Sequence, residues 1–276
     1  MLEFHLFRMT VYLPDQLSLY HQASRPDVSF QAITSVPSAE LRKGQKWHIG
    51  NVTRLDDAGL YFRVGRTSKL TVELYSAGQF TEQSFETAPY THVVIDHEIG
   101  LCALARKPKL SKTAAGIAEQ MARLLTQASP AVTVGARFEF QPVSDPNDFI
   151  AQLRVAYEIS KFWVTFSRPN PLDADEDFVK PMQRLAAAAD ADRGKTELKG
   201  RALSPASLES VARSAAATGD DAGAWLKPHK GQHRVRRSLR SNPAVLRLED
   251  VDASEPLRLL DRVRTWYRSI RGTKER

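Results

Sequence analysis

The stretch Thr91-His-Val-Val-Ile-Asp-His-Glu-Ile-Gly-Leu-Cys-Ala-Leu-Ala-Arg106 decides the first half of the fold. Its β-branched residues 93–95 favour a pleated, half-buried surface. Residues 97–100 supply the polar side chains and the glycine that a tight turn needs, and an apolar run follows them. We therefore predict a β-hairpin with strands at residues 91–96 and 101–106.

The sequence on the N-terminal side of this hairpin repeats the pattern. Residues 46–55 and 60–67 flank Asp56-Asp57-Ala58-Gly59, which predicts a second hairpin. Shorter strands are expected at residues 70–75 and 80–85. The first residues also predict a strand, because Leu2, Phe4 and Leu6 alternate with Glu3 and His5.

The sequence on the C-terminal side predicts one helix and a further strand. Ser111 occupies the position of a helix N-cap, and apolar residues from Ala114 to Leu125 recur at helical spacing. Residues 132–141 return to a strand pattern. We expect residues 1–143 to form a strand-rich antiparallel domain with one helix.

Beyond residue 143 the pattern changes to alternating helices and strands. Pro146 suits the first turn of a helix and Gly219 suits a helix C-terminus. The expected elements are a helix at 145–156, a strand at 159–167, a helix at 173–190, a strand at 195–203, a helix at 205–218, strands at 222–227 and 232–239, and a helix at 256–271. Residues 144–276 are thus predicted to form a mixed α/β domain, and the chain belongs to the α+β class.

Bulk composition excludes several classes of protein. The single cysteine, Cys102, rules out an internal disulfide framework and a thiolate metal cage. No apolar run reaches the roughly 18 residues of a membrane span, and the N-terminus lacks the pattern of a signal peptide. Motifs for a serine nucleophile, a dinucleotide or a nucleoside triphosphate are absent. We expect a soluble cytoplasmic protein without membrane insertion and without a cofactor. The leading hypothesis is a non-enzymatic protein, and a metal-dependent nuclease stays open as an alternative.

Positive charge is concentrated at the C-terminal end. Residues 191–276 carry a net charge of +8, whereas residues 1–190 carry −1. Residues 222–248 contain seven Lys or Arg and no acid. A one-sided basic region is the electrostatic signature of a protein that binds a polyanion, usually nucleic acid.

The basic segment, residues 227–240, is the leading candidate site. Pro228 and Gly231 place a turn between two strands, so that Arg234 and Arg236 share one face of the second strand and Arg237 lies on the other. The residues predicted to bind nucleic acid, mainly double-stranded DNA through its phosphates, are Lys227, Lys230, His233, Arg234, Arg236, Arg237 and Arg240. The alternatives are a solvated hairpin that protects a sheet edge from aggregation and a basic face for an acidic protein partner.

The terminal helix is also basic. Its apolar stripe is expected to pack on the core or to form a homodimer contact, while its arginines face solvent. Those arginines are Arg258, Arg262, Arg264, Arg268 and Arg271. Binding to an anionic membrane is a weaker alternative.

One cluster has the chemistry of a metal site. In a strand, His92, Asp96 and Glu98 share a face, which would suit a metal-dependent nuclease. The simpler interpretation is a polar hairpin turn, and we predict no metal there. Zinc-finger, basic-zipper and helix-turn-helix patterns are absent, so any DNA binding is expected to show little sequence specificity.

The order of these elements resembles that of the RexA-type phage-exclusion proteins and related prophage-type proteins. The shared layout includes a hairpin like residues 91–106, a strand like Phe138-Glu-Phe-Gln-Pro142, and the short sequence Arg168-Pro-Asn-Pro171 after a strand. The resemblance implies a two-domain cytoplasmic protein that dimerises, binds DNA with low specificity, and senses phage infection together with a membrane-protein partner.

Overall fold

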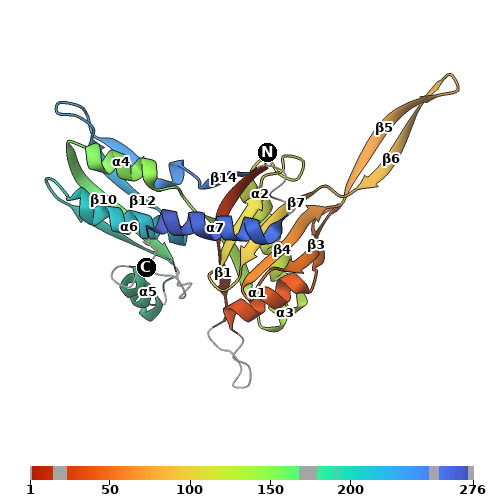
Figure 1. Cartoon of the computed structure of the whole chain (residues 1–276), viewed down its shortest axis with the longest axis horizontal. Helices are drawn as coiled ribbons and strands as arrows, with labels where there is room; N and C mark the ends of the chain where they lie inside the picture. The colour runs from red at the N-terminus through yellow and green to blue at the C-terminus, as the bar shows by residue number, and fades with distance from the viewer. Residues whose placement is uncertain are drawn as a thin grey trace.

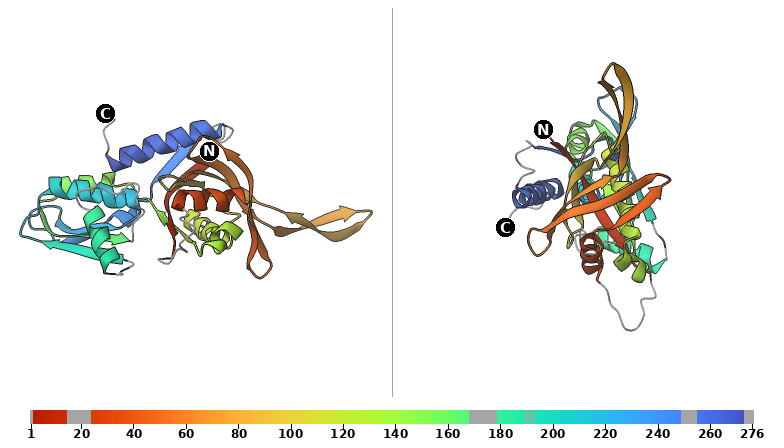
Figure 2. Two further views of the ribbon diagram at one scale, coloured as in Figure 1. Left: turned by 90° about the horizontal axis from the view of Figure 1, so that it is seen from below. Right: turned by 90° about the vertical axis from the view of Figure 1, so that its right-hand side faces the viewer.

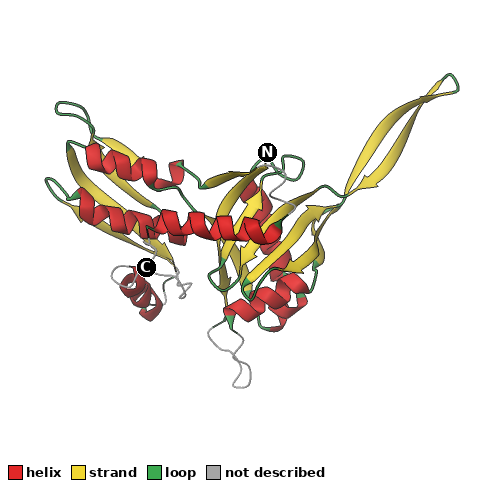
Figure 3. Cartoon of the chain, viewed as in Figure 1, coloured by secondary structure: helices red, strands yellow, loops and turns green. Residues whose placement is uncertain are grey.

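The computed structural model describes residues 2–14, 24–167, 179–189, 191, 193–248 and 255–272. Across these residues the strands form an eight-stranded sheet, a four-stranded sheet and a two-stranded ribbon, and helices pack on both larger sheets. Figure 3 shows this mixture of helix and strand, which confirms the predicted α+β class.

The first sheet is antiparallel throughout. Its order is β14-β1-β8-β7-β4-β3-β2, and β9 pairs with the far end of β1. The strands are β1 (Leu2–Tyr12), β2 (Ser38–Arg42), β3 (Gln45–Arg54), β4 (Gly59–Arg66), β7 (Tyr90–Asp96), β8 (Leu101–Ala105), β9 (Arg137–Pro142) and β14 (Val245–Leu248). Both predicted hairpins, β3–β4 and β7–β8, are present, and Oδ1 of Asp56 accepts from the amides of Ala58 and Gly59 in the first turn.

Three helices pack on one face of this sheet. They are α1 (Arg25–Thr34), α2 (Ala114–Thr126) and α3 (Ser129–Thr133). The predicted N-cap at Ser111 is wrong, because Oγ1 of Thr113 accepts from the amide of Gly116 and the helix begins two residues later. The predicted strand at 132–141 is wrong in its first half, because α3 takes up residues through Thr133 and β9 begins at Arg137.

Strands β5 (Ser68–Ser76) and β6 (Gln79–Thr87) form a ribbon that projects away from the first sheet. Figures 1 and 2 show it reaching past every other element at one end of the molecule. We refer to residues 68–87 as the arm. The sequence predicted both strands, although each is longer than expected.

The second sheet has the order β11-β10-β12-β13. Its strands are β10 (Glu158–Ser167), β11 (Arg193–Lys199), β12 (Ala222–Lys227) and β13 (Val235–Ser238), and its helices are α4 (Asn147–Val155), α5 (Val179–Ala188) and α6 (Pro205–Thr218). A 3-10 turn, η1 (Leu239–Ser241), follows β13. The expected acidic start of the helix at 173–178 and the Arg168–Pro171 sequence lie outside the described residues.

Helix α7 (Pro256–Arg271) connects the two halves, with the bounds that the sequence predicts. It packs along α6 and across β4 and β7, as Figure 1 shows. Its buried Tyr267 hydroxyl accepts from Arg8 at 2.9 Å and donates to the carbonyl of Ala217 at 3.1 Å.

The chain also returns to the first sheet after residue 143, through β14. One hydrophobic cluster therefore contains Phe4 and Val94 together with Phe162 and Leu259. The division near residue 143 stays a prediction. Within the described part of the chain, no helix is both long and apolar enough to cross a membrane.

Candidate nucleic-acid interface

The basic segment forms the predicted β-pair, in which β12 pairs with β13. Trp225 lies opposite Arg236, and Leu226 lies opposite Val235. Gly231 adopts a φ of +86° in the connecting turn, a conformation that suits glycine. The side chains of Lys230 and His233 are exposed in this turn. The second strand is shorter than predicted, since it covers only Val235–Ser238.

Two bases of the segment have an acidic partner on the neighbouring strand. Glu158 of β10 accepts from Arg234 at 2.7 Å and pairs with Nζ of Lys227 at 3.1 Å. The hydrogen bond from Arg234, and then that from Lys227, holds the pKa of Glu158 below its usual range. Part of the positive charge of the hairpin is therefore neutralised within the sheet.

The other bases of the segment point in different directions. Arg236 lies on the face of the sheet away from the helices, and Arg237 lies on the opposite face, as predicted from strand alternation. Arg234 precedes the strand and turns toward Glu158. Arg240 lies in η1, with Nε 3.8 Å from Asp221. The seven predicted residues thus do not form one continuous patch.

A different basic surface covers the face of the second sheet that the helices leave free. Antiparallel register places Lys161 opposite both Lys199 and Trp225, and Trp225 opposite Arg236. Directly opposed residues of neighbouring strands share a face. We call this surface the open face; it consists of Lys161, Trp163, Lys195, Glu197, Lys199, Trp225 and Arg236.

Helices α5 and α6 both lie on the other side of this sheet. Thr196 of β11 contacts Met182 of α5, and Thr196 lies opposite Val164, which belongs to the buried core. Buried Leu208 of α6 belongs to the same core cluster. Figure 1 shows α4 and α6 in front of the strands of this sheet. The open face therefore carries polar and charged side chains because only one face of the sheet is needed for the core.

Trp163 lies at the centre of the open face. Its indole ring lies over Gly223, where an added Cβ would overlap it. The guanidinium of Arg236 lies 4.9 Å from the ring centre and Nζ of Lys195 lies 5.6 Å from it. These cation–π contacts leave the tryptophan 4% exposed and hold two positive charges over the sheet.

Glu197 is the acid of the open face, and three lysines surround it. Nζ of Lys161 lies 2.7 Å from its carboxylate, with Lys199 at 3.2 Å and Lys195 at 3.9 Å. Lys161, followed by Lys199, lowers the pKa of Glu197. One carboxylate cannot balance three lysines and Arg236, so the open face keeps an excess of positive charge.

No protein-family model matches this chain, and no curated protein sequence matches it.

Sequence reasoning missed most of the open face because Lys161, Lys195 and Lys199 lie outside the basic segment. A signal was present in β11, where Arg193, Lys195, Glu197 and Lys199 occupy alternate positions. Period-two alternation of charged residues indicates a strand with one solvated face. The sequence also predicted strands at 159–167 and 222–227, but it could not show that β10 pairs with β11 on one side and with β12 on the other.

Arg240 extends the basic surface toward the first sheet. It lines a cleft of about 390 Å³ that also includes Arg193 and Thr165. It also lines a second cleft of about 530 Å³, together with Arg106 and Lys112. The first cleft is also lined by Glu139 and Asp220, and Arg193 pairs with Glu139 at 3.1 Å, so part of the positive charge along these clefts is neutralised.

The residues of the possible metal cluster have other roles. Oδ2 of the buried Asp96 accepts from Nε of Arg264 at 2.7 Å, and Oδ1 accepts from the amide of Ile99. Nδ1 of His92 lies 2.7 Å from the Tyr61 hydroxyl. Among the residues that the structure describes, no group of three His, Cys, Asp or Glu side chains is arranged to hold a metal ion.

The expectation that all the arginines of the terminal helix face solvent is wrong for Arg264. Its guanidinium is largely buried between Asp96 and Asp56. A basic residue on the polar side of this helix is buried here because the ends of two hairpins each present a carboxylate to it.

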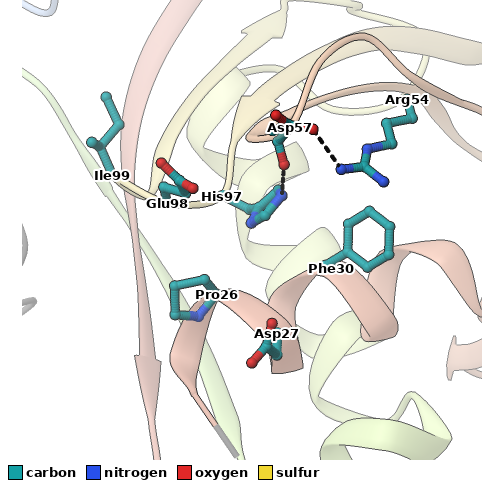
Figure 4. Close-up of a pocket in the computed structure, with 8 residues that line it drawn as sticks. All are labelled: Pro26, Asp27, Phe30, Arg54, Asp57, His97, Glu98 and Ile99. Carbon is teal, nitrogen blue, oxygen red and sulfur yellow. Dashed lines mark hydrogen bonds and ion pairs between the residues drawn. The ribbon is translucent and has the colours of Figure 1, made fainter.

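Glu98, the third residue of the possible metal cluster, lines a pocket of about 590 Å³ beside α1. His97 donates to the carbonyl oxygen of Asp57 at 3.2 Å, and Arg54 pairs with the Asp57 carboxylate at 3.0 Å. Figure 4 draws both contacts as dashed lines. Phe30 packs against the His97 ring. His97 thus joins the two hairpin turns, and residues 97–100 form a turn, as the simpler interpretation of the cluster predicts.

Proposed function

We propose that this protein is a non-enzymatic, low-specificity DNA-binding protein that acts in phage exclusion or defence. The observation that carries the proposal is the open face, where three lysines and Arg236 gather around two tryptophans on the uncovered face of the second sheet. Phosphates are attracted by such a surface whatever the base sequence.

The basic segment contributes the edge of the proposed interface. Lys230 and Arg236 have no acidic partner within the described part of the chain, so their charges remain available to phosphates. Arg237 lies on the opposite face of the sheet and is not part of this edge. Lys227 and Arg234 contribute less than the sequence predicts, because phosphate must compete with Glu158 for them.

The biological setting of the proposal comes from the RexA-type resemblance. It supports a cytoplasmic homodimer of prophage origin that works with a membrane-protein partner. The elements that carry the resemblance include the β7–β8 hairpin and the strand β9.

A salt titration tests DNA binding directly. Purified protein is titrated against a labelled duplex of arbitrary sequence, about 30 base pairs long, at about 50, 100 and 200 mM salt without divalent metal. With six to eight phosphate contacts, the slope of log affinity against log salt should be roughly −5 to −7. If the protein did not bind the duplex even at the lowest salt, the proposal of DNA binding would be wrong, and an acidic protein partner would be favoured.

Two variants locate the interface. Lys195→Ala with Lys199→Ala should flatten the slope by roughly 2, because two phosphate contacts are lost. Glu158→Gln should instead tighten binding about threefold, because Lys227 and Arg234 lose their competing anion. Equal binding by all three proteins would place the phosphates elsewhere on the molecule.

A further inference from the structure

The arm is the most exposed element of the molecule. Phe80 is 84% exposed and Tyr75 is 66% exposed, although both are large apolar side chains. Their rings lie 4.8 Å apart near the tip and cover each other only in part. An isolated two-stranded ribbon is at best marginally stable in water. A surface that covers the arm would therefore stabilise it.

The two faces of the arm differ in character. One face carries the cross-strand pair Leu70 and Phe85 together with Val72 and Leu74. The other face carries every charged residue of the arm as well as the two tip aromatics: Lys69, Glu73, Tyr75, Phe80, Glu82 and Glu86. The second face is thus acidic and aromatic, with a net charge of −2 in a chain of net charge +7.

Two acidic residues of the arm destabilise it. Glu73 lies directly opposite Glu82 in the register of the ribbon. Like charges in directly opposed positions destabilise a strand pair. A lysine-rich surface placed over this pair would convert the repulsion into attraction.

The open face of the second sheet has the complementary chemistry. It presents Lys195 and Lys199, which are largely exposed, beside Trp225, which is 39% exposed. Within one molecule the arm cannot reach this surface, because the two lie at opposite ends of the long axis (Figure 1). Two molecules lying side by side in opposite directions could place each arm on the other's open face.

We propose that the arm of one copy docks, with its acidic and aromatic face, on the open face of a second copy. Glu73 and Glu82 then pair with Lys195 and Lys199, and the tip aromatics lie against Trp225. Since the carboxylates occupy the lysines that phosphates would use, self-association and nucleic-acid binding exclude each other. The docking itself needs only charge complementarity and holds whether or not the open face binds DNA.

Charge-swap variants test the contact by sedimentation velocity without nucleic acid, at about 50 and 500 mM salt. The unaltered protein should associate at low salt and dissociate at high salt. Glu73→Lys with Glu82→Lys should be monomeric, and so should Lys195→Glu with Lys199→Glu. Mixing the two double variants should restore a heterodimer, because one pairing then regains opposite charges.

A matched control changes net charge by the same amount outside the arm. Glu98→Lys with Glu119→Lys alters two exposed acids and should associate like the unaltered protein. Association that survives the arm substitutions, or a mixture that stays monomeric, would overturn the docking proposal. A protein that binds no DNA but passes the charge-swap test would overturn the proposed function alone.

Competition supplies a second readout. Adding about one equivalent of duplex to the associated protein at low salt should release the association made through the arm and leave DNA-bound protein, and the arm variant should bind DNA at least as tightly as the unaltered protein. A complex in which DNA and the associated form coexist without loss of either would contradict mutual exclusion.

Discussion

Arg264 of α7 donates from Nε to Oδ2 of Asp96 at 2.7 Å, across 168 positions of sequence. The same guanidinium also pairs with Asp56 in the β3–β4 turn. One side chain thus joins the C-terminal helix to the ends of two hairpins of the first sheet. Asp96 is 7% exposed and Arg264 is 18% exposed, so the pair is largely shielded from water.

Removing this arginine should be strongly destabilising. Arg264→Ala leaves the buried Asp96 without its counter-charge, and we expect a loss of about 3 kcal/mol in the free energy of unfolding, measured with urea. Arg258→Ala is the control, because its pair with Glu255 is exposed and should contribute less than about 0.5 kcal/mol. Similar losses for the two variants would show that the Arg264 pair contributes little.

The same contact predicts a pH dependence. The hydrogen bond from Arg264 holds the pKa of Asp56 below its usual range. Between that value and the unfolded value of about 3.9 the unfolded chain binds more protons, so stability rises with pH. The contribution is complete above about pH 4 and is lost as the pH falls through the folded pKa. Asp56→Asn should reduce the slope of unfolding free energy against pH in this window; an unchanged slope would contradict the assignment.

A glycine at position 223 should be required for the packing of Trp163 on the open face. A Cβ at this position would overlap the indole of Trp163, so Gly223→Ala must displace the ring or the strand. We expect a loss of about 1–3 kcal/mol in unfolding free energy, as for other overpacking substitutions. Gly50→Ala in β3 is the matched control, because no atom lies within 4 Å of its Cβ position. If Gly223→Ala changed the unfolding free energy as little as Gly50→Ala, Trp163 would not need the space above Gly223.

Trp225 should distinguish single-stranded from duplex nucleic acid. Unpaired bases can stack on an exposed indole between two cations, whereas stacked base pairs cannot. Trp225→Ala should weaken binding of a single-stranded oligonucleotide about tenfold. Duplex affinity should change less than about twofold, since phosphates supply that interaction. Trp225→Tyr should retain most of the single-strand affinity, and equal losses on both ligands would exclude stacking.

Local sequence was sufficient for elements whose ends carry their own signals. Helix α6 begins at Pro205 and ends at Thr218, and its C-cap Gly219 has a φ of +79°. The bounds of α7 were predicted from its apolar stripe alone. Helix α1 was not predicted, although Ser24 caps it and Pro26 lies in its first turn. Its weaker apolar periodicity concealed a start signal that is present in the sequence.

The candidate site shows the opposite behaviour. Charge counting identified a basic C-terminal region, and strand alternation placed Arg236 and Arg237 on opposite faces. Counting could not show that Glu158 neutralises Lys227 and Arg234, because that residue lies 76 positions from Arg234. Nor could charge counting distinguish the basic residues of the segment that pair with an acid from those that do not.

By itself, the sequence determined the α+β class, the hairpins around residues 56–59 and 97–100, and the excess of positive charge, because each depends on residues close together in the chain. The strand order β11-β10-β12-β13, the pairing of β14 with β1 and the Arg264–Asp96 contact were decided only by the tertiary structure. These depend on which surfaces pack best once all elements are present, and that choice is made between residues far apart in sequence. The open face also depends on this long-range packing, because it forms only when β10, β11, β12 and β13 pair in one sheet.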